Sequence, residues 1–85
     1  MATWLDLVAR LEETLYADER LHAEATYRGE TLPQWLLQPL KDVTANAERR
    51  CPVLVLNVKG RQVQDSLCLL RLRDLEALLA QEAHA

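Results

Sequence analysis

The chain contains no phenylalanine or isoleucine, and it has only two glycines and two cysteines among its 85 residues. With glycine confined to Gly29 and Gly60, the sequence holds no glycine-rich phosphate-binding loop. Cys51 and Cys68 have no second cysteine or histidine at metal-ligand spacing, which excludes the usual zinc patterns. No apolar run approaches the roughly 20 residues that a membrane-spanning helix needs.

The composition that remains is typical of one small globular domain, which we expect to span residues 1–85. Hydrophobic residues make up 49% of the chain, which is enough for a core and too many for a disordered segment. A domain of this size buries only a modest fraction of its surface, so leftover apolar surface favours a homodimer. Cysteines interpreted as reduced thiols, with no secretory signal pattern, predict a cytoplasmic protein.

The charge balance disfavours a protein that only binds nucleic acid. The formal net charge is −3, whereas nucleic-acid-binding domains usually present a basic face. Short basic clusters occur at 49–50, 59–61 and 71–73. Ordinary solvated surface is the favoured interpretation of each cluster, and DNA contact remains the alternative.

Hydrophobic periodicity predicts an α/β (α+β) fold with the order α-β-α-β-β-α and a mixed sheet flanked by helices. Thr3 and Asp6 form a capping box for a first helix, which we expect to end near Tyr16 or Ala17. One face of that helix is apolar and could pair with its symmetry mate in a dimer. The predicted dimer stripe consists of Trp4, Leu7, Val8 and Leu11, and Leu15 continues the same apolar face.

The middle of the chain suggests a strand and a helix. Alternation over residues 20–28 predicts a strand, with a helix as the competing interpretation. A second capping box, Thr31 with Gln34, predicts a helix whose apolar stripe includes Trp35. Pro39 lies inside this pattern and should kink or split the helix, because it lacks a backbone donor.

Residues 51–79 predict a strand, a tight turn, a return strand and a helix. The segment 53–58 is nearly all apolar, so we expect both of its faces to be covered. Lys59-Gly60 supplies the turn, because glycine tolerates positive φ. The return strand is expected over 63–72 and the last helix over 73–82.

The candidate chemistry lies on the polar face of the 20–28 segment. Glu24 could hold Mg²⁺ if a second carboxylate converged on it, with Asp18 or Glu19 nearest in sequence. Such a metal could activate water against a phosphodiester. Exposed residues on an edge strand are the favoured interpretation when the residues are considered alone.

Residues 21–79 resemble small phage and bacterial nucleases of the PD-(D/E)XK superfamily, most closely the members related to Holliday-junction resolvases. The resemblance rests on the order of several short matches. These are Leu32-Pro33-Gln34-Trp35-Leu36, Pro52-Val53-Leu54-Val55-Leu56, Gly60-Arg61, Asp65-Ser66-Leu67 and Leu70-Arg71-Leu72.

The family's catalytic strand carries Glu-x-Lys, and the matching position here is Glu24-Ala25-Thr26. The resemblance therefore implies Glu24 as the catalytic and metal-binding residue. Asp18, the metal-site partner that its nearness in sequence suggests, is too close to Glu24 to be the family's preceding aspartate in the usual hairpin. Threonine replaces the catalytic lysine. Asp6 has a more plausible separation from Glu24 but falls at the first turn of a predicted helix.

Three functions follow as hypotheses. The first is a degenerate, phage-derived nuclease-like domain, weakly active or inactive, that retains binding to nucleic acid or protein; Arg28, Lys59 and Arg61 would contact DNA. The second is a homodimeric protein-interaction module with no nucleic-acid role. The third is an active Mg²⁺-dependent endonuclease. We expect no cofactor in the first two cases, Mg²⁺ in the third, and no membrane partner.

Overall fold

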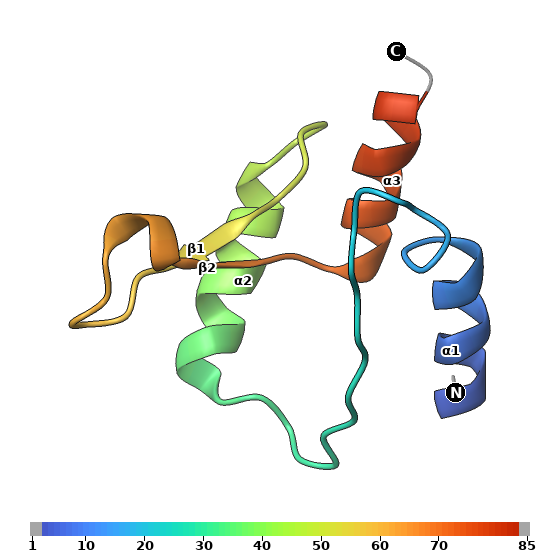
Figure 1. The fold of residues 1–85 in the computed structure, drawn as a ribbon. Coiled ribbons are helices and arrows are strands. Elements are labelled where there is room, and N and C mark those ends of the chain that lie inside the picture. The colour runs from blue at the N-terminus through green and yellow to red at the C-terminus, as the bar shows by residue number, and fades with distance from the viewer. Residues whose placement is uncertain (1–2, 84–85) are drawn as a thin grey trace. The chain divides into compact units, whose positions relative to one another are not determined.

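The computed structural model describes residues 3–83 and has a small α+β fold (Figure 1). Its elements follow the order α-α-β-β-α, with a 3₁₀ helix between the strands. The expected order α-β-α-β-β-α and the mixed sheet are therefore wrong. The described elements are α1 (Trp4–Glu13), α2 (Gln34–Asn46), β1 (Leu54–Leu56), η1 (Val63–Asp65), β2 (Leu67–Leu69) and α3 (Leu72–Ala83). The chain forms two compact units, residues 1–31 and 32–85, each described separately below.

In the first unit, the predicted capping box of α1 is confirmed. The Asp6 amide donates to Thr3 Oγ1 at 3.2 Å, and Asp6 Oδ2 accepts from the Thr3 amide at 2.9 Å. The backbone hydrogen bond from Thr3, followed by the side-chain bond, lowers the pKa of the Asp6 carboxyl. The helix ends at Glu13, earlier than expected, and the Thr14 hydroxyl donates to the carbonyl of Arg10 at 2.8 Å.

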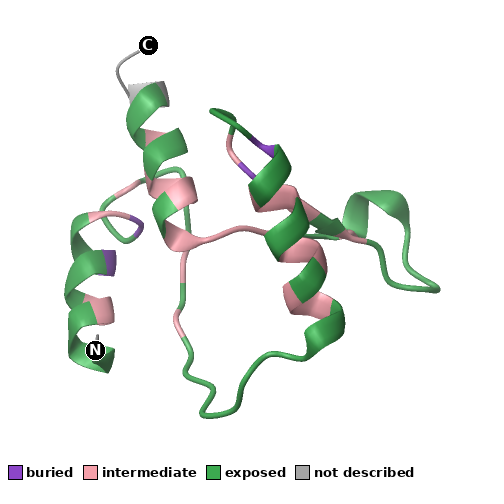
Figure 2. Ribbon diagram, turned by 180° about the vertical axis from the view of Figure 1, so that it is seen from behind, coloured by how far each residue is buried: buried purple, intermediate pink, exposed green. Residues whose placement is uncertain are grey.

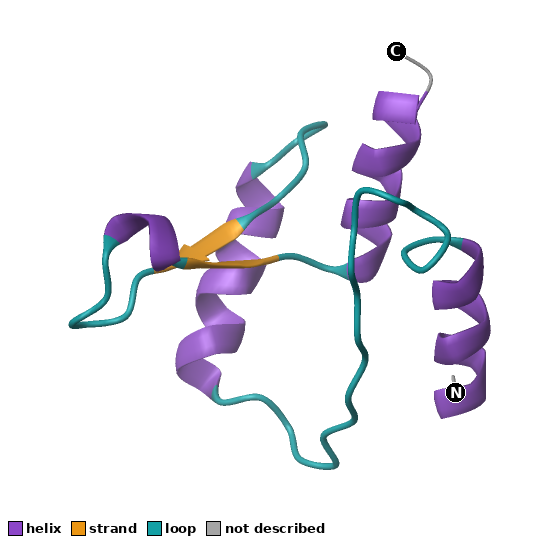
Figure 3. Ribbon diagram, viewed as in Figure 1, coloured by secondary structure: helices purple, strands orange, loops and turns teal. Residues whose placement is uncertain are grey.

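The strand expected over residues 20–28 is wrong, because this segment is a loop (Figure 3). Its alternating face offers two alanines, which bury too little apolar area to hold a strand against a sheet. Its polar side chains pair locally instead. His22 pairs with Glu24 and Arg28 with Glu30, each two residues apart.

The second unit begins with α2. The capping box that we expected for this helix, Thr31 with Gln34, does not form. Pro33 occupies the N-cap and makes no side-chain cap; its carbonyl accepts from the amides of Leu36 and Leu37. The helix continues through Pro39 without a break. Trp35 belongs to the apolar stripe of this helix, but 64% of Trp35 is exposed.

Strands β1 and β2 pair antiparallel with Leu54 opposite Leu69, Val55 opposite Cys68 and Leu56 opposite Leu67. Helix α2 packs against β1 and covers one face of this hairpin, as the opposite views of Figures 1 and 2 show. Because side chains alternate along a strand, the two half-buried β1 leucines lie on the covered face. Val55 lies on the open face with 61% of it exposed, so the expectation that both faces are covered is wrong.

The connection between the strands only partly follows the sequence pattern. Gly60 has φ of +88°, which confirms the turn expected at this glycine. The return strand expected over 63–72 is shorter, because residues 63–65 form η1 and α3 already begins at Leu72. The amides of Asp65 and Ser66 donate to the carbonyls of Gln62 and Val63, so polar residues close a local turn there.

The core is small. Among the described residues, few are buried (Figure 2). They are Leu11 and Leu15 in the first unit, and Ala47 and Pro52 in the second. Large apolar residues in both units remain exposed, including Leu5 at 77% and Val63 at 82%. Little apolar area is therefore available within either unit to offset the conformational entropy lost on folding.

We predict that Leu11→Ala lowers the free energy of unfolding by about 2–5 kcal/mol, because it removes buried methyl groups and leaves a cavity. Leu11 is 5% exposed, whereas Leu5 on the same helix is 77% exposed. The matched control Leu5→Ala should therefore change stability by no more than about 0.5 kcal/mol. Thermal unfolding followed by circular dichroism measures both. Equal losses in the two variants would contradict the described burial of α1.

Candidate functional site

The predicted catalytic residue Glu24 lies in the 20–31 loop, where 85% of its side chain is exposed. Its Oε2 lies 3.3 Å from Nε2 of His22, whose side chain is 88% exposed. Thr26, at the position of the family's lysine, is also exposed. No low-dielectric wall surrounds Glu24 in the described residues, so its charge is screened by water.

Asp18, the predicted second metal ligand, is held by Arg20. Arg20 donates through Nε to Oδ1 at 3.0 Å and through NH2 to Oδ2 at 2.7 Å, and its amide also donates to Oδ1. The side-chain hydrogen bonds from Arg20, then the backbone bond, lower the pKa of Asp18 to about 2. In residues 3–83 we find no cluster of three His, Cys, Asp or Glu that could hold a metal ion.

The predicted DNA-contacting residues belong to different units. Lys59 and Arg61 flank Gly60 at the turn after β1, and both are exposed. Arg28 belongs to residues 1–31, where its NH2 group pairs with Glu30 Oε2 at 3.1 Å. The structure thus brings Lys59 and Arg61 together on one turn and gives Arg28 an acidic partner of its own.

The predicted dimer stripe of α1 is partly accounted for within the chain. Leu11 is buried and Leu7 and Val8 are half-buried, while 43% of Trp4 is exposed. A dimer through this stripe would therefore rest mainly on Trp4. Dimerisation through this stripe stays a prediction.

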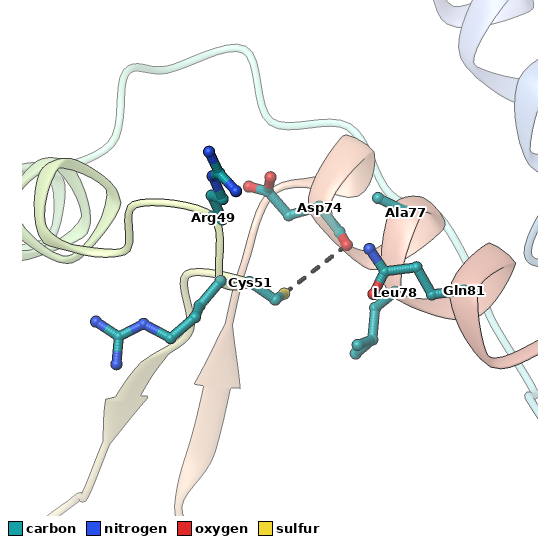
Figure 4. Close-up of a pocket in the computed structure, with 7 residues that line it drawn as sticks. Arg49, Cys51, Asp74, Ala77, Leu78 and Gln81 are labelled. Carbon is teal, nitrogen blue, oxygen red and sulfur yellow. Dashed lines mark hydrogen bonds between the residues drawn. The ribbon is translucent and has the colours of Figure 1, made fainter. Parts of the chain in front are cut away.

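A pocket of about 400 Å³ lies between α3 and the segment that leads into β1 (Figure 4). Cys51 Sγ donates to the carbonyl oxygen of Asp74 at 3.8 Å and ties that segment to α3. Asp74 Oδ2 is buried and has no hydrogen-bond partner in the described part of the chain. The pocket is lined by Arg49, Arg50, Cys51, Asp74, Ala77, Leu78 and Gln81.

Sequence reasoning missed this pocket. Asp74 lies in the first turn of α3, where a negative charge is favourable, and the sequence pattern shows no more than that. The arginines follow α2 directly after Glu48, which has φ of +57°. Arg49 points toward Asp74, whereas the Arg50 guanidinium donates to the carbonyls of Ala47 and Asn46 (Figure 4). The residues that line the pocket include no histidine or hydroxyl that would complete a nucleophile–base pair.

The hairpin of the second unit has unpartnered edges. The sheet consists of β1 and β2 alone, so in the described residues each strand has a strand neighbour on one side only. Its apolar side chains reach solvent, with Val55 61% and Leu67 55% exposed, and Cys68 is exposed as well. Surfaces of this kind mark sites of protein association.

No family model matches the chain, and neither the curated proteins nor the solved structures provide a match. The resemblance to PD-(D/E)XK nucleases thus stays a prediction. In residues 3–83, no helix has both the length and the hydrophobicity required to cross a bilayer.

We predict that the Asp18 carboxyl titrates near pH 2 and that Arg20→Gln returns its pKa toward the ordinary value of about 3.9. A carboxyl with a lowered folded pKa adds stability that is fully present above its unfolded pKa and disappears as the pH falls through the folded pKa. The hydrogen bonds between Arg20 and Asp18 should therefore persist above about pH 4 and be lost toward pH 2.

Carbon-detected NMR of the side-chain carboxyls follows this titration. Arg28→Gln is the matched control, because Arg28 pairs with Glu30, and it should leave the Asp18 midpoint unchanged. A wild-type midpoint close to 4 would show that Arg20 does not hold the carboxylate in solution.

Proposed function

We propose that this chain is a non-catalytic protein-interaction module that associates with itself through the β1–β2 hairpin. The observation that carries the proposal is the two-stranded sheet with exposed apolar side chains on an otherwise thinly buried unit. A two-stranded hairpin is marginally stable in water, and independent stability needs three or more strands or extensive packing. Association with a second copy would supply additional strands and additional packing.

The strand edges also lack the features that normally prevent association. Soluble proteins protect free edges with charged residues, proline or bulges. From Cys51 to Val58 the chain has no charged residue, and from Ser66 to Leu70 it again has none. Only Pro52, just before β1, interrupts these runs. An uncharged, β-branched and leucine-rich edge favours pairing with another strand.

A nucleic-acid-binding role, as the nuclease resemblance implies, is the second candidate. The exposed Lys59 and Arg61 on one turn favour it. Two cations make few phosphate contacts, and the net charge of −3 opposes approach to DNA. A catalytic role has less support, because Asp18 is held by Arg20 and Glu24 pairs only with an exposed histidine.

We predict that the wild-type chain sediments as a dimer or larger oligomer at micromolar concentrations. The double variant Val55→Lys/Leu67→Lys should sediment as a monomer, because it places a charge on each face of the hairpin. Val63→Lys is the matched control, since Val63 is 82% exposed and lies outside both strands. Sedimentation equilibrium decides the matter. A wild-type chain that stays monomeric at about tenfold higher concentration, or a control that dissociates equally, would refute self-association through the hairpin.

A further inference from the structure

We infer that the pocket between α3 and residues 49–51 binds a small zwitterion, of the class of a free α-amino acid with an aliphatic side chain. Asp74 accepts hydrogen bonds from the ligand's ammonium group, and Arg49 donates to its carboxylate. The pocket lies outside both strands, so this inference goes beyond the proposed self-association and does not depend on it.

Two segments of the second unit form the walls of this pocket (Figure 4). One is residues 49–51, which lead into β1, and the other is one face of α3. The hydrogen bond from Cys51 Sγ to the Asp74 carbonyl, at 3.8 Å, joins the two walls. The pocket is therefore formed before a ligand enters. The helix contributes residues spaced three and four apart, as a single helical face requires, namely Asp74, Ala77, Leu78 and Gln81.

The carboxylate of Asp74 lacks a donor. Its Oδ2 is buried and has no hydrogen-bond partner within residues 3–83. A buried acceptor without a donor is unfavourable, and more so when it carries a charge. A donor that enters from the pocket and reaches this carboxylate would remove that cost.

Arg49 supplies the opposite charge. Figure 4 shows its side chain pointing toward Asp74, yet the two form no ion pair, and Arg49 has no other charged partner in the part of the chain that the structure describes. Arg50 differs, because it donates to the carbonyls of Ala47 and Asn46 at 3.3 and 3.4 Å. The cation available to a ligand in this pocket is therefore Arg49.

An unpaired carboxylate beside an unpaired guanidinium selects a ligand that carries both charges. A simple anion would be attracted by Arg49 and repelled by Asp74, and a simple cation would meet the reverse. An α-amino acid carries its ammonium and carboxylate on one carbon, so a single molecule can satisfy both side chains. Hydrogen bonds between charged partners are stronger than neutral ones, which favours the zwitterion over a neutral amide of the same size.

The rest of the pocket sets the side chain and the size of the ligand. Leu78 is 43% exposed and Ala77 is exposed beside it, so an aliphatic group of the ligand would remove apolar surface from water. The volume of about 400 Å³ is near the lower end of the range for small-molecule sites, about 300–1,000 Å³. That volume suits a single amino acid better than a large cofactor.

Titration of the full chain with L-leucine, followed by NMR of the backbone amides, tests the site. We expect saturable shifts at residues 49–51 and 74–81 with a dissociation constant of about 10⁻⁴–10⁻³ M, because so small a ligand makes few contacts. N-acetyl-leucine lacks the ammonium charge and leucinamide lacks the carboxylate. Each should bind at least about tenfold more weakly, since each leaves one protein charge unpaired. This comparison uses the wild-type chain and needs no variant to fold.

Removing each charge from the protein provides a second comparison. Asp74→Asn and Arg49→Gln should each raise the dissociation constant for L-leucine at least about tenfold. Asp65→Asn and Arg73→Gln are the matched controls, because they neutralise exposed side chains of the same types that do not line the pocket. The controls should change the dissociation constant less than about twofold. Circular dichroism checks that each variant folds.

The two cysteines give an independent readout from one sample. Cys51 lines the pocket, whereas Cys68 is exposed on β2 and does not line it. Saturating L-leucine should slow the alkylation of Cys51 by N-ethylmaleimide at least about threefold and leave that of Cys68 unchanged. Mass spectrometry of the digested chain measures both rates.

Saturable shifts at the pocket that weaken when either charge is removed, from the ligand or from the protein, support the inference. Absence of shifts at residues 49–51 and 74–81 in about 10 mM L-leucine overturns it. Equal binding of leucine and its two neutralised derivatives, or equal slowing at Cys51 and Cys68, overturns it as well. Sedimentation reads the oligomeric state separately, so each of these outcomes leaves the proposed self-association to its own test.

Discussion

The structure depends on one constraint, which is that backbone amides and carbonyls of a strand need partners on both sides. The sheet of this chain has only two strands, so β1 and β2 each satisfy one side within the described residues. A hairpin with this deficit is marginal by itself. Helix α2 covers one face of β1, but it supplies no backbone partner to a strand edge. The remaining edges are the reason that association is the function we propose.

Local signals in the sequence were read with partial success, because the Thr31–Gln34 capping box is absent and Pro33 occupies the N-cap of α2. The Thr3–Asp6 capping box and the glycine turn at Gly60 depend on residues within a few positions, and both are present. Strand signals fared worse because strands depend on distant partners. Residues 20–28 alternate but have no paired strand, and residues 63–65 close a 3₁₀ turn instead of extending β2.

The difference between local signals and distant contacts also applies to the candidate sites. Glu24 and Asp18 were selected by residue type and by family resemblance, but side-chain pairing decides their chemistry: Asp18 is bound to Arg20 and Glu24 to His22. At the pocket, Cys51 contacts Asp74, which lies 23 positions further along the chain, and no local sequence pattern predicts such a contact. The exposed hairpin could have been suspected, because its uncharged runs are visible in the sequence.

The central claim is that the hairpin reaches full stability only when a second copy completes its sheet. Hydrogen exchange of the backbone amides of Leu67, Cys68 and Leu69, measured across a range of protein concentrations, tests this claim most directly. We expect protection of these amides to rise with concentration and to fall on dilution, because open strand edges exchange readily and paired ones do not. Protection that stays constant while the chain remains monomeric would contradict the account.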